Sequence, residues 1–476
     1  MSAQFRYSDI QTSQLSRRTF LRLAATGATG ALLAACTLPA PQTDTGQASP
    51  GAAERTQVSV FESCWDAPHI DAGEELYVQF QNENPDIAVT AFWPAAGSDW
   101  ATELLAKVAA GEQIDVIWWC SSHHKFAEEG RLLDLRDLVE NDPDFSFDDF
   151  QQVGVDFSYD QPGRGGALWG IPTNYATILL WYNMNMFDNA GVAYPDPTWT
   201  YTDLLEAAIQ LTKDTNGDGT PEEWGFSIPD GSWYIEPVIE AFGGGMVDVD
   251  SDQPCMLNQP ASVEALQWLQ DLFFTHKVSP TPADMAGMGA SAMLISNKLA
   301  MGFWPEWGQR EFLSSHDDVG LNYGVTLIPE GPAGRVTNYW AGITSVTSTV
   351  SDPDAAWQVV KFITGDTYQR MMTVTLPESP SARIETARYG FEEAESYPDD
   401  RSALLESPQY GNQYYGVARY GKEMLDIVDP SLDPVWEGAM APDAVVDEIC
   451  ANVETKVAEL KATAGSSSMG ICIDCV

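Results

Sequence analysis

The loop KDTNGDGTPEEWGF carries residue types that bind calcium in proteins. Asp214, Asn216 and Asp218 place oxygen-bearing side chains at alternate positions, and a glycine follows where a calcium loop turns sharply. Glu222 stands at the ninth position, but the twelfth, where an EF-hand has a bidentate glutamate, is Gly225. The pattern is therefore half of an EF-hand at most. It predicts either a structural calcium site on these four acidic and amide side chains or a turn whose side chains bond its own backbone. No other cofactor is expected.

Aromatic residues form the second group with a chemical use. The chain has 16 tryptophans, 17 tyrosines and 19 phenylalanines. The apolar face of a sugar ring stacks on an aromatic ring, and its hydroxyls bond polar side chains. Several aromatics stand at expected loop ends rather than within apolar stripes, and these are candidate ligand-binding residues: Trp65, Trp119, Tyr175, Trp233, Tyr234, Trp307 and Trp340. Trp118, Trp357 and Trp436 are expected to pack in the core.

The elements that position these residues alternate between strands and helices. Short β-branched or aromatic runs at Val58–Phe61, Ile87–Phe92 and Asp115–Trp119 predict strands, and the segments Ala72–Asn82 and Trp100–Ala110 predict helices between them. This alternation favours parallel strands with crossover helices. Ligands bind such sheets beyond the carboxyl ends of the strands.

Polar side chains follow two of these strand ends. Ser63 and Asp66 come after the first strand, and Ser121 comes after the third. We therefore add these three residues to the expected ligand site. Later in the chain, Tyr323–Ile328 and Gly342–Thr347 predict a pair of strands separated by a glycine and proline turn.

Catalytic motifs are weak in this sequence. It lacks a Gly-x-Ser-x-Gly elbow and a His-Glu-x-x-His metal helix. Glycoside hydrolysis needs two carboxylates at a set separation. Because the chain has 69 acidic residues, some pair will always fit, so such a pair does not indicate a hydrolase. His123 and His124 are adjacent, and adjacent positions on a helix point in different directions, which disfavours a metal site. We expect a binding protein rather than an enzyme.

The N-terminal segment has the features of an export signal. Residues 1–35 contain the adjacent pair Arg17 and Arg18, followed by a moderately apolar stretch too short to span a bilayer. The ending Leu-Ala-Ala-Cys resembles a bacterial lipobox, in which Cys36 is lipidated and becomes the mature N-terminus. Residues 36–55 are rich in Pro, Gly, Ala, Ser and Thr, which is typical of a flexible tether.

Charge and cysteine content restrict the function further. The formal net charge of -45 disfavours nucleic acid as a partner. If Cys36 is lipidated, six cysteines remain, and outside the cytoplasm an even number permits disulfides of unknown connectivity. Cys472 and Cys475 form a CxxC without a second pair, which favours a local disulfide over structural zinc.

Four segments, in order along the chain, resemble the carbohydrate-type extracellular solute-binding proteins (family 1) of ABC importers, which are relatives of the maltose-binding protein. The segments are FQNENPDIAVTAF, GIPTNYATILLWYNMNMFDNAGV, KLAMGFWPEWG and AGITSVTSTVSDPDAAWQVVKFITGDTYQ. Each motif is weak alone, but the ordered set covers nearly all of the mature chain. The resemblance implies a stacking aromatic near Trp307 and polar groups of the cleft near Ser63, Asp66 and Ser121.

The resemblance also implies a fold and a division into domains. The fold class is α/β, periplasmic-binding-protein-like type II, with two α/β lobes joined by a hinge of several chain crossings. The expected division is a signal peptide at 1–35, a tether at 36–55, lobe 1 at 56–174 and 327–375, lobe 2 at 175–326 and 376–464, and a tail at 465–476.

The function implied is that of an extracytoplasmic lipoprotein on the outer face of the cell membrane. It would be a monomer that captures a sugar or oligosaccharide between its lobes and delivers it to an ABC permease. Two alternatives remain open. One is a binding protein for a polyamine or other small cation, and the other is a secreted glycoside hydrolase.

Overall fold

The computed structural model describes residues 55–468, except 64, 96–97, 99, 120–122, 162–164, 230, 286, 377–378 and 395. The chain divides into two units, Met1–Ala53 and Glu54–Val476, and the fold below is that of the second. The expected signal peptide, the lipidation of Cys36, nearly all of the tether and the Cys472–Cys475 pair lie outside the described residues.

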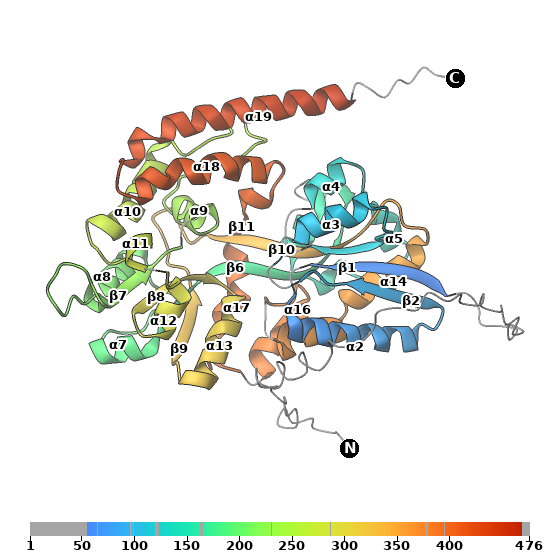
Figure 1. Ribbon diagram of the computed structural model, residues 1–476, viewed down its shortest axis with the longest axis horizontal. Coiled ribbons are helices and arrows are strands. Elements are labelled where there is room, and N and C mark those ends of the chain that lie inside the picture. Colours follow the sequence, from blue (N-terminus) through green and yellow to red (C-terminus); the bar gives the residue numbers. More distant parts are fainter. Residues whose placement is uncertain are drawn as a thin grey trace, which may run out of the picture. The chain divides into compact units, whose positions relative to one another are not determined.

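One mixed sheet organises the second unit (Figure 1). Its strand order is β2-β1-β3-β10-β6-β8-β7, with β11 beside β10 and β9 beside β6, and β4 and β5 form a separate pair. The bounds are β1 Thr56–Glu62, β2 Ile87–Phe92, β3 Val116–Trp119, β4 Tyr159–Gln161, β5 Gly165–Leu168, β6 Ile171–Asn183, β7 Trp224–Ser227, β8 Leu299–Pro305, β9 Tyr323–Leu327, β10 Thr337–Val346 and β11 Gly411–Gln413.

The pairing confirms the predicted parallel strands at the start of the chain. β1 lies parallel to both β2 and β3. The predicted pairing of the two later strands is wrong, because β9 and β10 do not pair with each other. Both run antiparallel to β6 and pair with successive parts of it. β10 pairs with residues Ile171 to Thr177 of β6, and β9 pairs with residues Leu179 to Asn183. β6 is buried along its whole length, so it can carry both strands end to end.

The helices that connect the strands begin at ordinary capping signals. Asp66 caps the start of the helix after β1, and Asp352 caps the helix after β10. Thr200 and Asp203 form a complete capping box. The longer helices are α2 Ala67–Glu83, α3 Trp100–Ala109, α8 Tyr201–Leu211, α9 Ser232–Ala241, α10 Pro260–Phe274, α13 Gly308–Val319, α14 Pro353–Ile363, α18 Gly421–Trp436 and α19 Val446–Ser468.

The shorter helical segments fill the connections. They are α4 His124–Glu128, α5 Arg136–Glu140, η2 Phe147–Asp149, α6 Gln152–Phe157, α7 Met184–Ala190, α11 Pro282–Met285, α12 Ala290–Ile295, α15 Asp366–Arg370, η3 Met371–Thr375, α16 Ile384–Arg388, η4 Tyr389–Glu393, α17 Ser402–Glu406, η5 Ser407–Tyr410, η6 Tyr415–Val417 and η7 Pro442–Ala444.

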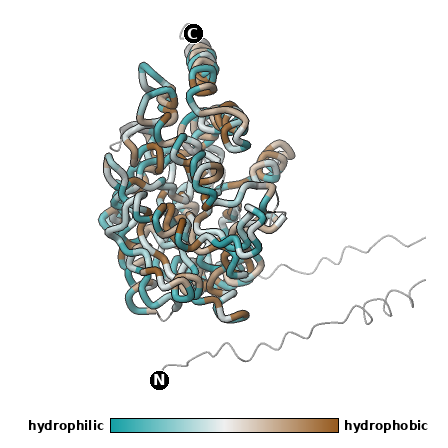
Figure 2. The backbone as a smooth tube through the Cα atoms, turned by 90° about the vertical axis from the view of Figure 1, so that its left-hand side faces the viewer, coloured by the Kyte–Doolittle hydropathy of each residue, from teal (hydrophilic) through white to brown (hydrophobic). Residues whose placement is uncertain are grey.

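The buried apolar side chains fall into four clusters. Two contain residues 58–176 and 339–382, and the other two contain residues 178–328 and 403–457. Trp118 and Trp357 are buried in the first pair, and Trp436 packs against the second, which confirms their predicted packing role. Figure 2 shows hydrophobic and hydrophilic stretches interleaved along the chain. Among the described helices, none is both long and apolar enough to cross a membrane.

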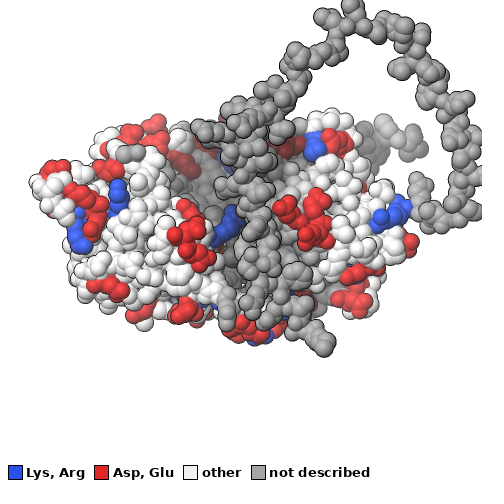
Figure 3. All heavy atoms as spheres, turned by 60° about the horizontal axis from the view of Figure 1, so that its bottom comes forward, with Lys and Arg blue, Asp and Glu red and all other residues white. Residues whose placement is uncertain are grey.

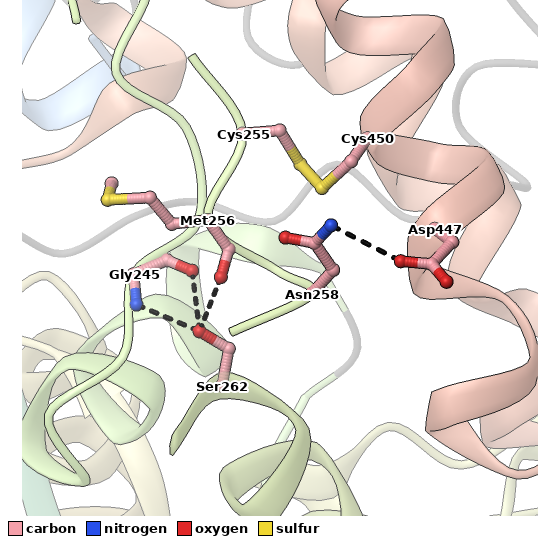
Figure 4. The surroundings of a disulfide bond; sticks show 7 residues. All are labelled: Gly245, Cys255, Met256, Asn258, Ser262, Asp447 and Cys450. Carbon is pink, nitrogen blue, oxygen red and sulfur yellow. Dashed lines mark hydrogen bonds between the residues drawn. A yellow bond between two sulfur atoms is a disulfide. The ribbon is translucent and has the colours of Figure 1, made fainter. Parts of the chain in front are cut away.

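A disulfide joins Cys255 to Cys450, 195 residues apart in the sequence. It fixes α19 to the segment that precedes α10 (Figure 4). Beside it, the Ser262 hydroxyl donates to the carbonyls of Gly245 and Met256. The sequence alone left this connectivity open.

Candidate solute-binding site

Two predicted tryptophans lie together. Trp233 stands in the first turn of α9, and Trp307 immediately precedes α13. Their rings are nearly parallel, with centroids 6.2 Å apart and an interplanar angle of 25°. Trp307 is 40% exposed, whereas Trp233 is half-buried. The pair therefore presents an aromatic surface that is open to solvent on the Trp307 side.

Trp233 contacts both groups of clusters. It packs against the cluster that contains Trp340 and against the large cluster below α9, and Tyr414 meets its ring edge-on at 4.9 Å. The Asn338 side chain donates to the Trp233 carbonyl at 2.6 Å. Trp233 is thus bonded to strand β10 through its carbonyl and packs against both clusters through its side chain.

Trp233 and residues that contact it or follow it by one turn carry polar atoms without partners. Trp233 Nε1, Trp340 Nε1, Asn338 Oδ1 and one carboxyl oxygen of Glu236 are buried and make no hydrogen bond. An unpaired buried polar group is costly, and such groups are rare in folded proteins unless a ligand or water satisfies them. Donors and acceptors beside an aromatic surface are the combination that a sugar requires.

Glu236 is the acidic member of this group. Burial, reinforced by the charge of Glu240 one turn away, raises the pKa of Glu236 well above its ordinary value. The side chain of Asn412 donates to Glu240 at 2.8 Å. Glu236 was not among the predicted site residues, because a single glutamate in a chain with 69 acids carries no signal of its own.

His123 and His124, which the sequence disfavoured as a metal site, lie together. Their rings stack with centroids 4.5 Å apart, so the expectation that adjacent positions diverge is wrong here: His123 is the cap residue before α4, and only His124 is helical. Both nitrogens of His123 and one of His124 lack partners. Burial, together with the neighbouring ring, lowers the pKa of His123 well below its ordinary value.

Three predicted aromatics have packing roles instead. Trp65 is buried, stacks on Trp118 at 4.6 Å and donates to Glu62 at 2.9 Å. Trp119 is buried and donates to Ser345 at 3.0 Å. Tyr175 is buried, with its hydroxyl donating to the Leu404 carbonyl at 2.8 Å. The polar atoms of these three rings are bonded within the protein, and the rings pack in the core. Their position at the ends of predicted strands did not distinguish a buried ring from one that is open to a ligand.

Of the other predicted residues, Ser63 is buried and bonds the Trp118 carbonyl, and Tyr234 is half-buried against the large cluster. Trp340 is buried beside Trp233. Ser121 lies outside the described residues.

Asp66 pairs with a cation rather than standing free. Its carboxylate lies 2.8 Å from Arg310 Nη1 and also contacts the ring of His69. Partial burial acts to raise the pKa of Asp66, but the hydrogen bond from His69 and the charges of His69 and Arg310 outweigh it and hold the pKa below its ordinary value. A second ion pair joins Arg419 to Glu128 at 2.5 Å.

The predicted calcium loop bonds its own backbone. Asp214 accepts from the amides of Gly217 and Gly219 at 2.6 and 2.9 Å, and Glu222 accepts from the Thr215 amide at 2.7 Å. Within the described part of the chain, no three acidic, histidine or cysteine side chains converge as metal ligands. This geometry is that of the alternative turn, and calcium binding stays a prediction.

Residues 66–370 match the family model of the bacterial extracellular solute-binding protein. The chain therefore belongs to this family, whose members act outside the cytoplasm. A binding protein of Brucella abortus is 21% identical over 394 residues, covering 80% of this chain and 88% of the relative. The maltotriose-binding protein of Pyrococcus abyssi is 22% identical over 350 residues, covering 69% of each chain.

Among solved structures, the ABC substrate-binding protein of Listeria monocytogenes in complex with cycloalternan is similar, with a TM-score of 0.73 and 24% identity. The match covers 85% of this chain and all of that one. This likeness shows the α/β solute-binding fold that the sequence predicted.

Proposed function

We propose that this protein captures an oligosaccharide and delivers it to an ABC importer without altering it. The observation that carries the proposal is the aromatic surface of Trp233 and Trp307, with buried unpaired donors and acceptors beside it. The relatives support it: the protein from Pyrococcus abyssi is a maltotriose-binding protein, and the one from Listeria holds cycloalternan.

The expected two lobes are part of this proposal. The four apolar clusters divide the chain close to the predicted boundaries, near residues 176, 328 and 382. Trp233 contacts clusters of both groups. The ion pairs Asp66–Arg310 and Arg419–Glu128 each join residues assigned to different lobes. A solute that contacts both lobes would favour their closed arrangement.

Lipid anchoring belongs to the proposal as well. Twin-arginine export and lipidation of Cys36 would hold the protein on the outer face of the cell membrane, where a monomer could meet its permease. A Cys36→Ser variant is expected to remain exported but to leave the membrane fraction.

The solute is tested by calorimetry and by analysis of the recovered ligand. We expect at least one neutral oligosaccharide, in a panel that includes maltotriose, to bind and to be recovered intact. Trp307→Ala should weaken that binding at least tenfold, because an aromatic stacking surface contributes on the order of 1 kcal/mol or more beyond its buried area.

Trp93→Ala is the matched control, because Trp93 packs against α2 and donates to Glu74, away from the described site. Its affinity should change less than twofold. Release of a cleaved product in more than one equivalent would contradict a binding protein. Binding of an amino acid, with no response to any sugar, would contradict the solute class.

A further inference from the structure

A second cavity lies beside β9 and shares no residue with the solute site described above. Its volume is about 310 Å³, at the lower end of the range that holds small organic ligands. β9, the end of β6, the segment 195–197 and the segment 397–406 form its walls. The last of these includes α17, which lies beside β9 (Figure 1).

Aromatic rings form the inner surface of this cavity. Tyr182, Tyr323 and Tyr397 all line it, and the rings of Tyr323 and Tyr397 meet edge-on at 4.9 Å. Tyr182 lies directly over Gly324, where a Cβ atom would come within 2.2 Å of its ring. Burial, with the charge of Asp400, raises the pKa of Tyr182 to about 12, so its phenol stays neutral. One face of the Tyr397 ring is stacked on His316, with centroids 3.7 Å apart. A cation would meet the ring faces that remain open to the cavity.

Carboxylates form the rim. Asp196, Asp399, Asp400 and Glu406 line the cavity and are exposed. None of the four forms an ion pair with a described residue, although the charge of Asp399 acts on Arg401. Asp196 and Asp400 accept hydrogen bonds from Thr198 and Ser402. No described lysine or arginine lines the cavity. Arg401, which neighbours Asp400 in the sequence, is turned to the carbonyls of Gly390, Phe391 and Ala394.

A buried hydroxyl supplies a separate sign of a ligand. Thr326 lines the cavity and is only 4% exposed, yet its Oγ1 makes no hydrogen bond. β9 pairs with β6 through its backbone, which leaves this side chain to the cavity. A hydroxyl both donates and accepts, so it can bond a polar group of a bound molecule.

The geometry points to a binding site for an organic ammonium cation in this cavity. A metal ion fits less well, because no three acidic side chains converge on one point within the described structure. Carboxylates spread around an aromatic surface suit a charge distributed over an alkylammonium group. A neutral sugar would gain nothing from the four negative charges, whereas a cation is attracted to them.

The test is calorimetry on the whole exported chain with choline, spermidine and 3,3-dimethyl-1-butanol, the neutral isostere of choline. We expect the two cations to bind and the neutral alcohol to bind at least tenfold more weakly. Asp399→Asn/Glu406→Gln, which removes two carboxylates that accept no hydrogen bond from a described cap or turn, should weaken cation binding at least tenfold. Thr326→Val should weaken it about threefold.

Asp137→Asn/Glu140→Gln is the matched control, because it removes two exposed carboxylates from α5 and lowers the charge equally. Its cation affinity should stay within twofold of the wild type. Equal affinity for the alcohol, or equal loss in the control variant, would overturn the proposal. Displacement of choline by a bound sugar would also overturn the proposal, because it would assign the cation to the solute site. If no sugar binds, the proposed function fails, but the measured binding of the cation still supports the second site.

Discussion

Glu306 is a buried carboxyl group directly before the exposed Trp307. It accepts hydrogen bonds from the Thr177 amide at 2.7 and 3.0 Å and from the Thr177 hydroxyl. Burial nevertheless dominates and raises the pKa of Glu306 to about 8. Between pH 4.5 and about 8, Glu306 therefore keeps its proton in the folded protein and loses it in the unfolded chain.

The pH dependence of stability tests this proton. Because the pKa is raised on folding, the folded state binds more protons between pH 4.5 and about 8. The contribution of Glu306 is complete below pH 4.5 and is lost as the pH rises toward 8. In urea unfolding from pH 5 to 8, Glu306→Gln should lose less stability than the wild type, whereas Glu437→Gln, an exposed control, should follow the wild type. Parallel curves for all three proteins would contradict the argument.

The individual residues of the site were harder to predict from the sequence than the fold was. Trp233 and Trp307 were found because they stand near loop ends and, for Trp307, because of the resemblance. Glu236 and Asn338 were not found, since nothing in the neighbouring sequence distinguishes a buried unpaired atom from an exposed one. That distinction depends on the packing of segments far apart in the chain.

At the scale of elements, the disulfide is the clearest constraint. It closes a loop of nearly 200 residues between the segment before α10 and α19. A crosslink over a long loop restricts the unfolded chain, and removing a native one typically costs about 2–5 kcal/mol.

Cys255→Ser/Cys450→Ser is therefore expected to lower the free energy of unfolding by about 2–5 kcal/mol, measured by urea denaturation. Reductant should lower the stability of the wild type to a similar level and leave the double variant unchanged. If the variant is as stable as the wild type, α19 is held by its apolar contacts alone.

The elements themselves were largely predictable. Alternating strands and helices at the start of the chain follow from local periodicity, and their parallel pairing is confirmed. The pairing partner of β9 and β10 could not be predicted. Both strands pair with β6, which lies about 150 residues earlier in the chain and whose burial is not visible in the local sequence. Local patterns identify a strand but not its neighbour.

At the scale of the whole molecule, charge is the dominant property. The formal charge is -45, and on the face drawn in Figure 3 acidic groups outnumber basic ones. Repulsion among like charges destabilises a compact state, and salt screens it. We expect the melting temperature to rise as sodium chloride increases from 0.02 to 0.5 M, because the Debye length falls from about 22 Å to about 4 Å over this range. A neutral osmolyte at matched osmolality is the control, and a melting temperature that falls with salt would contradict this reading.

The position of β10 has a consequence for synthesis. The cluster that begins at Val58 is completed by side chains as late as Ala382, and β3 has β10 as its second neighbour. At the usual rates of translation the first strands wait on the order of tens of seconds for these partners. During that interval α2 can pack on them through Leu76, Tyr77 and Phe80, but the cluster still lacks its members from Val346 to Ala382. Apolar surface that is exposed during synthesis is prone to aggregate. We therefore expect truncated forms that end before β10 to aggregate rather than fold as a separate half.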